Sequence, residues 1–200
     1  MTWVGTGETR YKAVLNRPMF QQPALPCYHR LKWEHLMSNA HTEYSSFREN
    51  VIEHLFIGRC LQELWKQKFF KAEVLRADVD GSGYDIVIEA RNRLRHIQLK
   101  ASFEGGATRQ QKINVSLAAK PSGCVVWIVF DPDTLDFREF LWFGADPGSP
   151  LPSLDGFKTA RHTKGDATGF KAERTGIKIV PRGRFEKIAT LAELSGKLFG

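Results

Sequence analysis

Two segments of alternating character, residues 83–90 and 96–101, constrain the fold of this chain more than any other feature. Along one side of both segments the side chains are apolar: Ile86, Ile88, Ala90, Ile97, Leu99 and Ala101. Along the other side they are mainly polar: Asp85, Val87, Glu89, His96, Gln98 and Lys100. Because successive side chains of a strand point to opposite faces, this pattern predicts a β-hairpin with one apolar face.

The same two sets of side chains predict a register for the hairpin. A turn centred on Asn92 and Arg93 pairs residues of like character: Asp85 with Lys100, Val87 with Gln98, Glu89 with His96, Ile86 with Leu99 and Ile88 with Ile97. A slip of one residue would destroy this agreement, because it would turn one strand over. We therefore expect Asp85, Gln98 and Lys100 on one face of a sheet.

A long helix is predicted before the hairpin, over residues 43–68. Its apolar residues recur at helical spacings: Phe47, Val51, Ile52, Leu55, Phe56, Cys60, Leu61, Leu64 and Trp65. Thr42 or Ser45 is expected to cap its start. A strand over residues 73–76 and a turn over residues 78–83, rich in glycine and aspartate, lead into the hairpin.

After the hairpin, the apolar run 124–130 predicts a fully buried central strand, and residues 137–143 predict the next strand. Residues 107–120 are ambiguous, since 112–117 suit either a strand or the start of a short helix. Residues 177–180 suit a short strand, and the apolar positions between Phe185 and Leu198 predict a terminal helix. We expect Trp65, Trp127 and Trp142 in the core.

On sequence, the chain divides into three parts. Residues 1–40, interrupted by Pro18, Pro23 and Pro26, form an irregular N-terminal extension in which Met37 is an alternative start. Residues 41–150 form the predicted core. After the proline-rich break at 147–152, residues 151–200 form a basic C-terminal extension that packs on the core.

Asp85, followed by a hairpin and Gln98-Leu99-Lys100, resembles the motif of the PD-(D/E)XK nuclease superfamily, the restriction-endonuclease-like proteins. The resemblance spans residues 43–143. It implies an α/β (α+β) core with a central mixed β-sheet, a hairpin that carries the site, and flanking helices. Two positions depart from the pattern: Tyr84 stands where a proline is common, and Gln98 replaces the second carboxylate.

The resemblance implies a metal-dependent nuclease with Mg²⁺ or Mn²⁺ as cofactor. Asp85 would be the principal metal ligand, and Glu53 on the long helix the second. The Gln98 side-chain oxygen and the Leu99 carbonyl would add neutral oxygens, the ligand type that hard cations prefer. Lys100 would orient the attacking water or stabilise charge on the phosphate.

Other roles for these residues stay open. Glu43 or Glu49 can replace Glu53 as the helix acid, and Glu89 can supply a further carboxylate. Asp85 and Lys100 can also form nothing more than a cross-strand ion pair.

The charge of the chain favours a polyanionic partner. The formal net charge is +7, and the residues from Gly156 onward contain ten Lys or Arg against four Asp or Glu. Closely spaced basic residues there are candidates for nucleic-acid binding: Lys158, Arg161, Lys164, Lys171 and Arg174. They predict contact with a phosphate backbone. For the nuclease that the resemblance implies, we expect DNA rather than RNA as the substrate. A solvated basic loop is the alternative.

Composition excludes several other classes. No apolar run approaches the roughly 20 residues of a membrane span, and the first residues lack the pattern of a secretory signal. Cys27, Cys60 and Cys124 form neither a disulfide framework nor a CxxC metal site. We expect a cytoplasmic protein without a membrane partner, for which a homodimer is allowed. Two functions compete with a nuclease: a catalytically inactive nucleic-acid-binding module of the same fold, and a small interaction protein with a basic tail.

Overall fold

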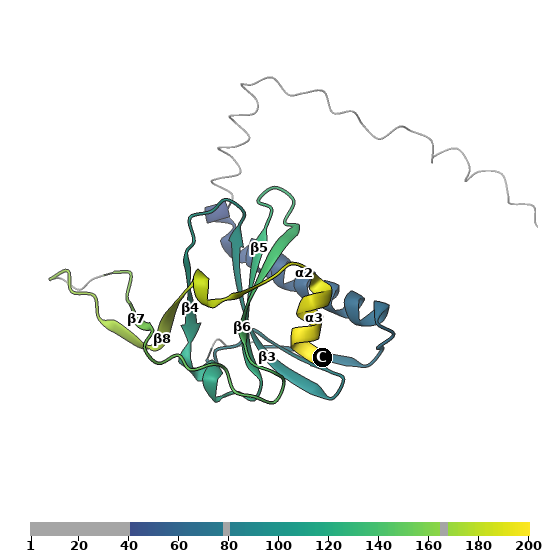
Figure 1. The fold of residues 1–200 in the computed structure, drawn as a ribbon. Helices are drawn as coiled ribbons and strands as arrows, with labels where there is room; N and C mark the ends of the chain where they lie inside the picture. Colours follow the sequence, from purple (N-terminus) through teal and green to yellow (C-terminus); the bar gives the residue numbers. More distant parts are fainter. Residues whose placement is uncertain (1–40, 78–80, 165–167) are drawn as a thin grey trace, which may run out of the picture. The chain divides into compact units, whose positions relative to one another are not determined.

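The structure, a computed structural model, describes residues 41–77, 81–164 and 168–200. The chain divides after Glu43, and the unit Tyr44–Gly200 has three layers (Figure 1). Two helices, α2 (Ser45–Lys66) and α3 (Leu191–Phe199), cover one face of a six-stranded sheet. A three-stranded sheet covers the opposite face.

The central sheet contains six strands in the order β1-β2-β3-β5-β6-β9. Their bounds are β1 (Ala72–Arg76), β2 (Ile86–Ala90), β3 (Arg93–Phe103), β5 (Gly123–Phe130), β6 (Phe137–Gly144) and β9 (Glu186–Ile188). The pair β3 and β5 is parallel, and the other four pairs are antiparallel. The predicted α+β class, with a central mixed sheet flanked by helices, is confirmed.

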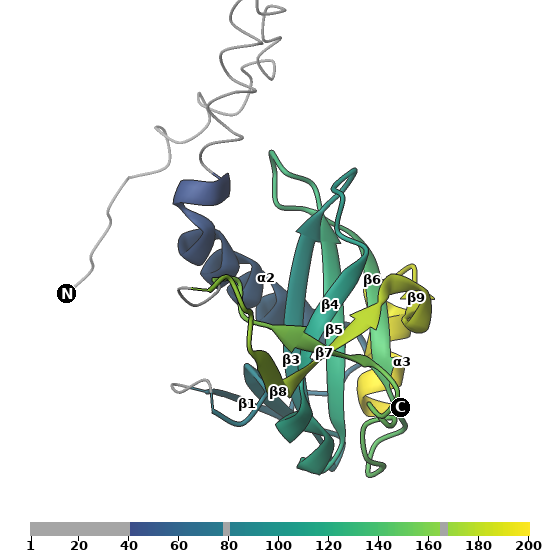
Figure 2. The ribbon, with the colours of Figure 1, turned by 90° about the vertical axis from the view of Figure 1, so that its left-hand side faces the viewer.

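The second sheet has the order β4-β8-β7 and is antiparallel throughout. Its strands are β4 (Gln110–Asn114), β8 (Glu173–Pro181) and β7 (Lys158–Arg161). Figure 2 views the molecule from the side of this sheet, which lies in front of β3 and β5, with α2 behind them.

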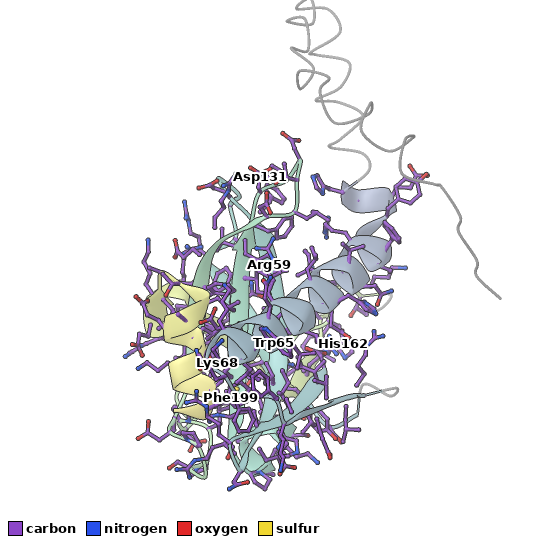
Figure 3. All side chains as sticks on the ribbon, turned by 90° about the vertical axis from the view of Figure 1, so that its right-hand side faces the viewer. Arg59, Trp65, Lys68, Asp131, His162 and Phe199 are labelled. Carbon is purple, nitrogen blue, oxygen red and sulfur yellow. The ribbon has the colours of Figure 1, made fainter. Side chains whose placement is uncertain are left out.

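A hydrophobic core fills each gap between layers. The helix-side core contains one face of the central sheet together with Ile52, Phe56, Leu194 and Leu198 from the two helices. The sheet-side core contains the other face together with residues of the second sheet, among them Ile113 and Val180. Figure 3 shows α2 and α3 against the central sheet, with Phe199 labelled on α3.

Strand β5 lies between both cores, so that all eight of its residues are buried. This confirms the predicted central strand and explains its unbroken apolar sequence, since neither face meets water. Trp127 and Trp142 are 0% and 4% exposed, in agreement with the prediction that they are core residues.

The hairpin turns one residue earlier than predicted. Arg91 and Asn92 form the turn, and both have positive φ angles (53° and 58°), as a two-residue type I′ turn requires. As a result Ile86 pairs with Ile97 and not with Leu99. The predicted register was wrong by two residues. The residues on each face of the hairpin are nevertheless those predicted, because side-chain direction in a strand repeats every two residues.

Helix α2 is buried along a narrower stripe than predicted. The buried positions are Ile52, Phe56, Cys60, Glu63 and Leu64. Most lie at steps of four residues, which follow one side of a helix. Trp65 and Phe47 lie off this line and are 65% and 70% exposed, so the prediction of a core Trp65 was wrong. Tyr44 is the N-cap and makes no side-chain capping bond, so neither Thr42 nor Ser45 has the expected role.

The ambiguous stretch after the hairpin contains both candidate elements, the strand β4 and then a 3-10 helix, η1 (Val115–Ala119). The Asn114 side chain accepts a hydrogen bond from the backbone N–H of Ser116 and caps η1. The chain thus crosses from β3 to the parallel strand β5 through β4 and η1.

The C-terminal part of the chain contributes to every layer. Strands β7 and β8 form most of the second sheet, β9 is an edge strand of the central sheet, and α3 lies in the helix-side core. The terminal helix is shorter than expected, since Phe185 and Ile188 precede it. The division into three parts at residues 40 and 150 stays a prediction.

Candidate active site

A pocket of about 490 Å³ lies where the start of α2 meets β3 and the residue before β2. Four charged residues that the sequence singled out line it, namely Glu49, Glu53, Asp85 and Lys100. Leu99 and Ala101 of β3 line it as well. The structure therefore brings together Asp85, Lys100, Leu99 and two of the three candidates for the helix acid. Glu43 does not line this pocket.

Asp85 is held in the sheet by its backbone and by its side chain. Its N–H donates to the Ile97 carbonyl at 2.9 Å, and its carbonyl accepts from the Ala77 N–H at 2.9 Å. Its carboxylate oxygen Oδ2 accepts from the Leu99 N–H at 2.6 Å. The two backbone bonds fix Asp85 in the sheet, and the bond from the Leu99 N–H orients its carboxylate.

The Leu99 carbonyl faces the same side of β3 as Asp85. In a strand the N–H and C=O of one residue point toward the same neighbour, and the Leu99 N–H reaches Asp85. Strand β2 begins only at Ile86, so Leu99 lies beyond the last paired residues of β2 and β3. The carbonyl oxygen is thereby directed toward the pocket that Leu99 lines.

Glu53 is the more enclosed of the two helix acids. Its side chain is 18% exposed and accepts a hydrogen bond from the Nε atom of Arg76, the last residue of β1. Glu49 is 67% exposed and lies 4.0 Å from Arg48. Both carboxylates line the pocket, and the burial of Glu53 makes it the better placed of the two to act beside Asp85.

Lys100 and Gln98 lie on the same face of β3 but have different surroundings. In the parallel register Lys100 is beside Trp127 and Gln98 beside Val125, on the face opposite to Leu99. Lys100 lines the pocket, whereas Gln98 is 6% exposed and does not. Glu89 pairs with Leu94 near the turn and is far along β2 from Asp85, so it is not brought to the pocket.

The oxygen donors of the pocket suit a hard cation. Within the described residues, no group of three or more His, Cys, Asp or Glu side chains could hold a metal ion. Mg²⁺, however, is ordinarily bound by one or two carboxylates, with waters and substrate phosphates completing its shell. Asp85, Glu53 and the Leu99 carbonyl form a donor set of that size.

The Gln98 side chain provides a further observation. Its Oε1 atom is buried and accepts no hydrogen bond from any residue that the structure describes. A buried acceptor without a donor is costly, and such groups occur where a ligand or water completes them. A neutral amide oxygen is compatible with Mg²⁺, but Gln98 does not line the pocket.

The described cysteines offer no competing nucleophile. Cys60 and Cys124 are free and buried. Burial raises the pKa of the Cys124 thiol to about 12 and raises the pKa of Cys60 as well, so neither forms a thiolate near neutral pH. Cys27 lies outside the described residues.

The candidate nucleic-acid-binding residues belong to the β7–β8 hairpin. Lys158 and Arg161 lie on β7, Arg174 on β8, and Lys164 and Lys171 in the connection; all five are exposed. Figure 1 shows this hairpin extending away from the central sheet. Arg161 lies 3.6 Å from Glu173, so part of its charge is balanced within the hairpin.

Several residues of the pocket region were missed from the sequence: Ser46, Arg48 and Asn50 on α2, Gln111, and Arg76 beside the pocket. Gln111 comes from β4, whose position depends on pairing with β8. Arg76 contacts Glu53 across the gap between β1 and α2. The sequence held one signal for Arg76, its place at the end of a predicted strand just before the turn that leads to Asp85.

Comparisons with known proteins assign no family. No family model matches the chain, and no curated protein matches it. Among solved structures, the bacterial homing endonuclease I-Ssp6803I is similar, with 16% identity and a TM-score of 0.28. The match covers 61% of this chain and 82% of that chain. So low a TM-score carries no functional argument.

No helix among the described residues has both the length and the apolar character needed to cross a membrane.

Proposed function

We propose that this protein is a metal-dependent nuclease of the PD-(D/E)XK type that hydrolyses phosphodiester bonds in DNA. One observation carries the proposal. Asp85 precedes β2, Glu53 lies on α2, and Leu99 and Lys100 lie on β3, yet all four residues line one pocket. Two carboxylates and a lysine around a polar pocket are what hydrolysis of an anionic ester requires, because the site must bind a cation and stabilise added negative charge.

Each group has a distinct part in the proposed reaction. Bound Mg²⁺ or Mn²⁺ would neutralise the phosphate and lower the pKa of water. Asp85 and Glu53 would hold the cation with their carboxylates, and the Leu99 carbonyl would add a neutral donor, whereas Gln98 does not line the pocket. Lys100 would donate a hydrogen bond to the attacking water or to a phosphate oxygen. As the water oxygen bonds to phosphorus, the water would release a proton to solvent, the ester P–O bond would break, and the leaving oxygen would take up a proton from solvent.

The alternative within the same fold is a nucleic-acid-binding module without activity. Two observations favour it: Gln98 replaces a carboxylate, and Arg76 already engages Glu53. An interaction protein with a basic tail is the third function. Cleavage that requires a divalent metal separates the nuclease from both, and salt-dependent DNA binding separates the binding module from the interaction protein.

Lys100→Met is expected to lower the turnover of DNA cleavage by roughly 100- to 1,000-fold at saturating DNA, the usual loss when one transition-state donor is removed. The assay follows a labelled duplex with Mg²⁺ or Mn²⁺ and, in parallel, with EDTA. Lys71→Met is the matched control, since Lys71 is exposed and outside the pocket. Equal turnover of the two variants, or cleavage that persists in EDTA, would contradict the proposal.

The basic hairpin is proposed to hold the phosphate backbone while the pocket cuts it. Replacing Lys158, Arg161 and Lys164 by Ala should make the plot of log binding constant against log salt concentration less steep for duplex DNA. Its slope should change by up to about 0.9 for each phosphate that is no longer neutralised. The weakening should be similar for all sequences, and turnover at saturating DNA should change far less.

The control removes the same charge elsewhere, with Lys66, Lys71 and Arg93 replaced by Ala; all three are exposed and outside the hairpin. Binding is measured by fluorescence anisotropy across a salt titration, with Ca²⁺ in place of Mg²⁺. If both triple variants show the same slope as the unmodified protein, the hairpin is a solvated loop.

A further inference from the structure

Arg76 is linked to both acids of the pocket. Its side chain contacts Glu53, and the residue after it in the chain hydrogen-bonds to Asp85. Its Nε atom donates to the Glu53 carboxylate, and its Nη1 atom lies 3.4 Å from His54 Nε2. Arg76 pairs with Ile86 in the sheet, and the next residue, Ala77, donates to the Asp85 carbonyl. The guanidinium therefore comes from the segment that also holds Asp85 in place.

The burial of the two partners is unequal. The Glu53 side chain is 18% exposed and the Arg76 side chain 45% exposed. Glu53 shares its pocket with Asp85, so two carboxylates of like charge line the same space. A guanidinium supplies the opposite charge, and because it is half-exposed it can leave toward solvent while Glu53 stays.

A divalent cation needs the same carboxylate oxygens. Oxygen lone pairs that accept a hydrogen bond from Arg76 cannot coordinate a metal at the same time, and the fixed positive charge repels a second cation at short range. Arginine also binds phosphate oxygens well, through paired N–H donors. A phosphate in the pocket would thus give the released guanidinium another partner.

We propose that Arg76 is a positioning residue that serves as the internal counter-ion of Glu53 and competes with the metal ion for that carboxylate. This inference rests on the proposed function. In the absence of nucleic acid, Arg76 lowers the affinity of the pocket for the metal ion. The ion therefore binds less before a phosphate is present.

The test measures Mn²⁺ binding to the full chain without DNA, from the electron paramagnetic resonance signal of free Mn²⁺. Arg76→Gln should bind Mn²⁺ about fivefold more tightly, since a partly exposed ion pair contributes little more than that. Arg76→Lys, which keeps the charge, should stay close to the unmodified protein. In a Glu53→Gln background the effect of Arg76→Gln should disappear, which a purely structural role for Arg76 would not produce.

The matched control is Arg59→Gln. Arg59 lies on the same helix as Glu53 (Figure 3) and pairs with Asp136 at 3.0 Å, but it does not line the pocket. Arg59→Gln removes one positive charge and one ion pair, as Arg76→Gln does, and it should leave Mn²⁺ affinity unchanged.

Two results would overturn the inference, and they differ in what else they overturn. If Arg76→Gln binds Mn²⁺ no more tightly, while Asp85→Asn abolishes binding, Arg76 does not compete and the metal site stands. If no variant shows Mn²⁺ binding that depends on Asp85, the proposed function fails as well. Thermal unfolding of each variant confirms that the measured protein is folded.

Discussion

Asp85→Asn is expected to lower Mg²⁺-dependent DNA cleavage by at least about 1,000-fold. A metal ion contributes several kcal/mol of transition-state stabilisation, and each 1.36 kcal/mol corresponds to a factor of ten in rate. The amide oxygen of asparagine can still accept the hydrogen bond from the Leu99 N–H. The melting temperature should therefore stay nearly unchanged, so that a lower rate reports removal of the charge.

Two further variants sharpen this measurement. Asp85→Ala should lose activity equally but also part of its stability, because the Leu99 N–H would lose its acceptor. Glu89→Gln removes a carboxylate farther along β2, at an exposed position outside the pocket, and it should cleave at the normal rate. Full activity of a folded, nuclease-free preparation of Asp85→Asn would remove Asp85 from the site.

Arg95→Ala is expected to lower the free energy of unfolding by about 3 kcal/mol, in the range for a buried charge-assisted hydrogen-bond network that is removed. Arg95 is 0% exposed. Its Nε atom donates to the Leu198 carbonyl at 2.9 Å and its Nη2 atom to the Lys197 carbonyl at 2.5 Å. The guanidinium thus satisfies the last carbonyls of α3 and fastens that helix to β3.

Urea unfolding monitored by circular dichroism measures this effect. Arg93→Ala is the control, since Arg93 lies two residues earlier on the same strand and is exposed. It should change the free energy of unfolding by no more than about 0.5 kcal/mol, as is usual for surface substitutions. If Arg95→Ala and Arg93→Ala are equally stable, the hydrogen bonds to α3 contribute nothing net.

The sequence alone predicted the elements whose character is local. The alternation around Asp85 and Lys100 correctly predicted two strands and the residues on each face, because side-chain direction in a strand depends only on position. The unbroken apolar run from Cys124 to Phe130 predicted a central strand for the same kind of reason. The functional assignment of Asp85, Glu53 and Lys100 stays a proposal, although one pocket gathers all three.

Features that depend on distant parts of the chain were decided only by the tertiary structure. The hairpin register depended on the positive φ angles at Arg91 and Asn92, which residue character did not reveal. Trp65 is exposed because its side of α2 faces away from the helix-side core, although its neighbour Leu64 is buried in that core.

The contacts of Arg76 with Glu53 and of Arg95 with α3 are of this second kind. They join residues 23 and 103 positions apart. Whether a charged side chain finds a partner depends on which elements pack against its own, and periodicity along the chain carries no information about that. The sequence therefore determined the strands and their faces, and the packing of helices and second sheet against them determined which polar groups share the pocket.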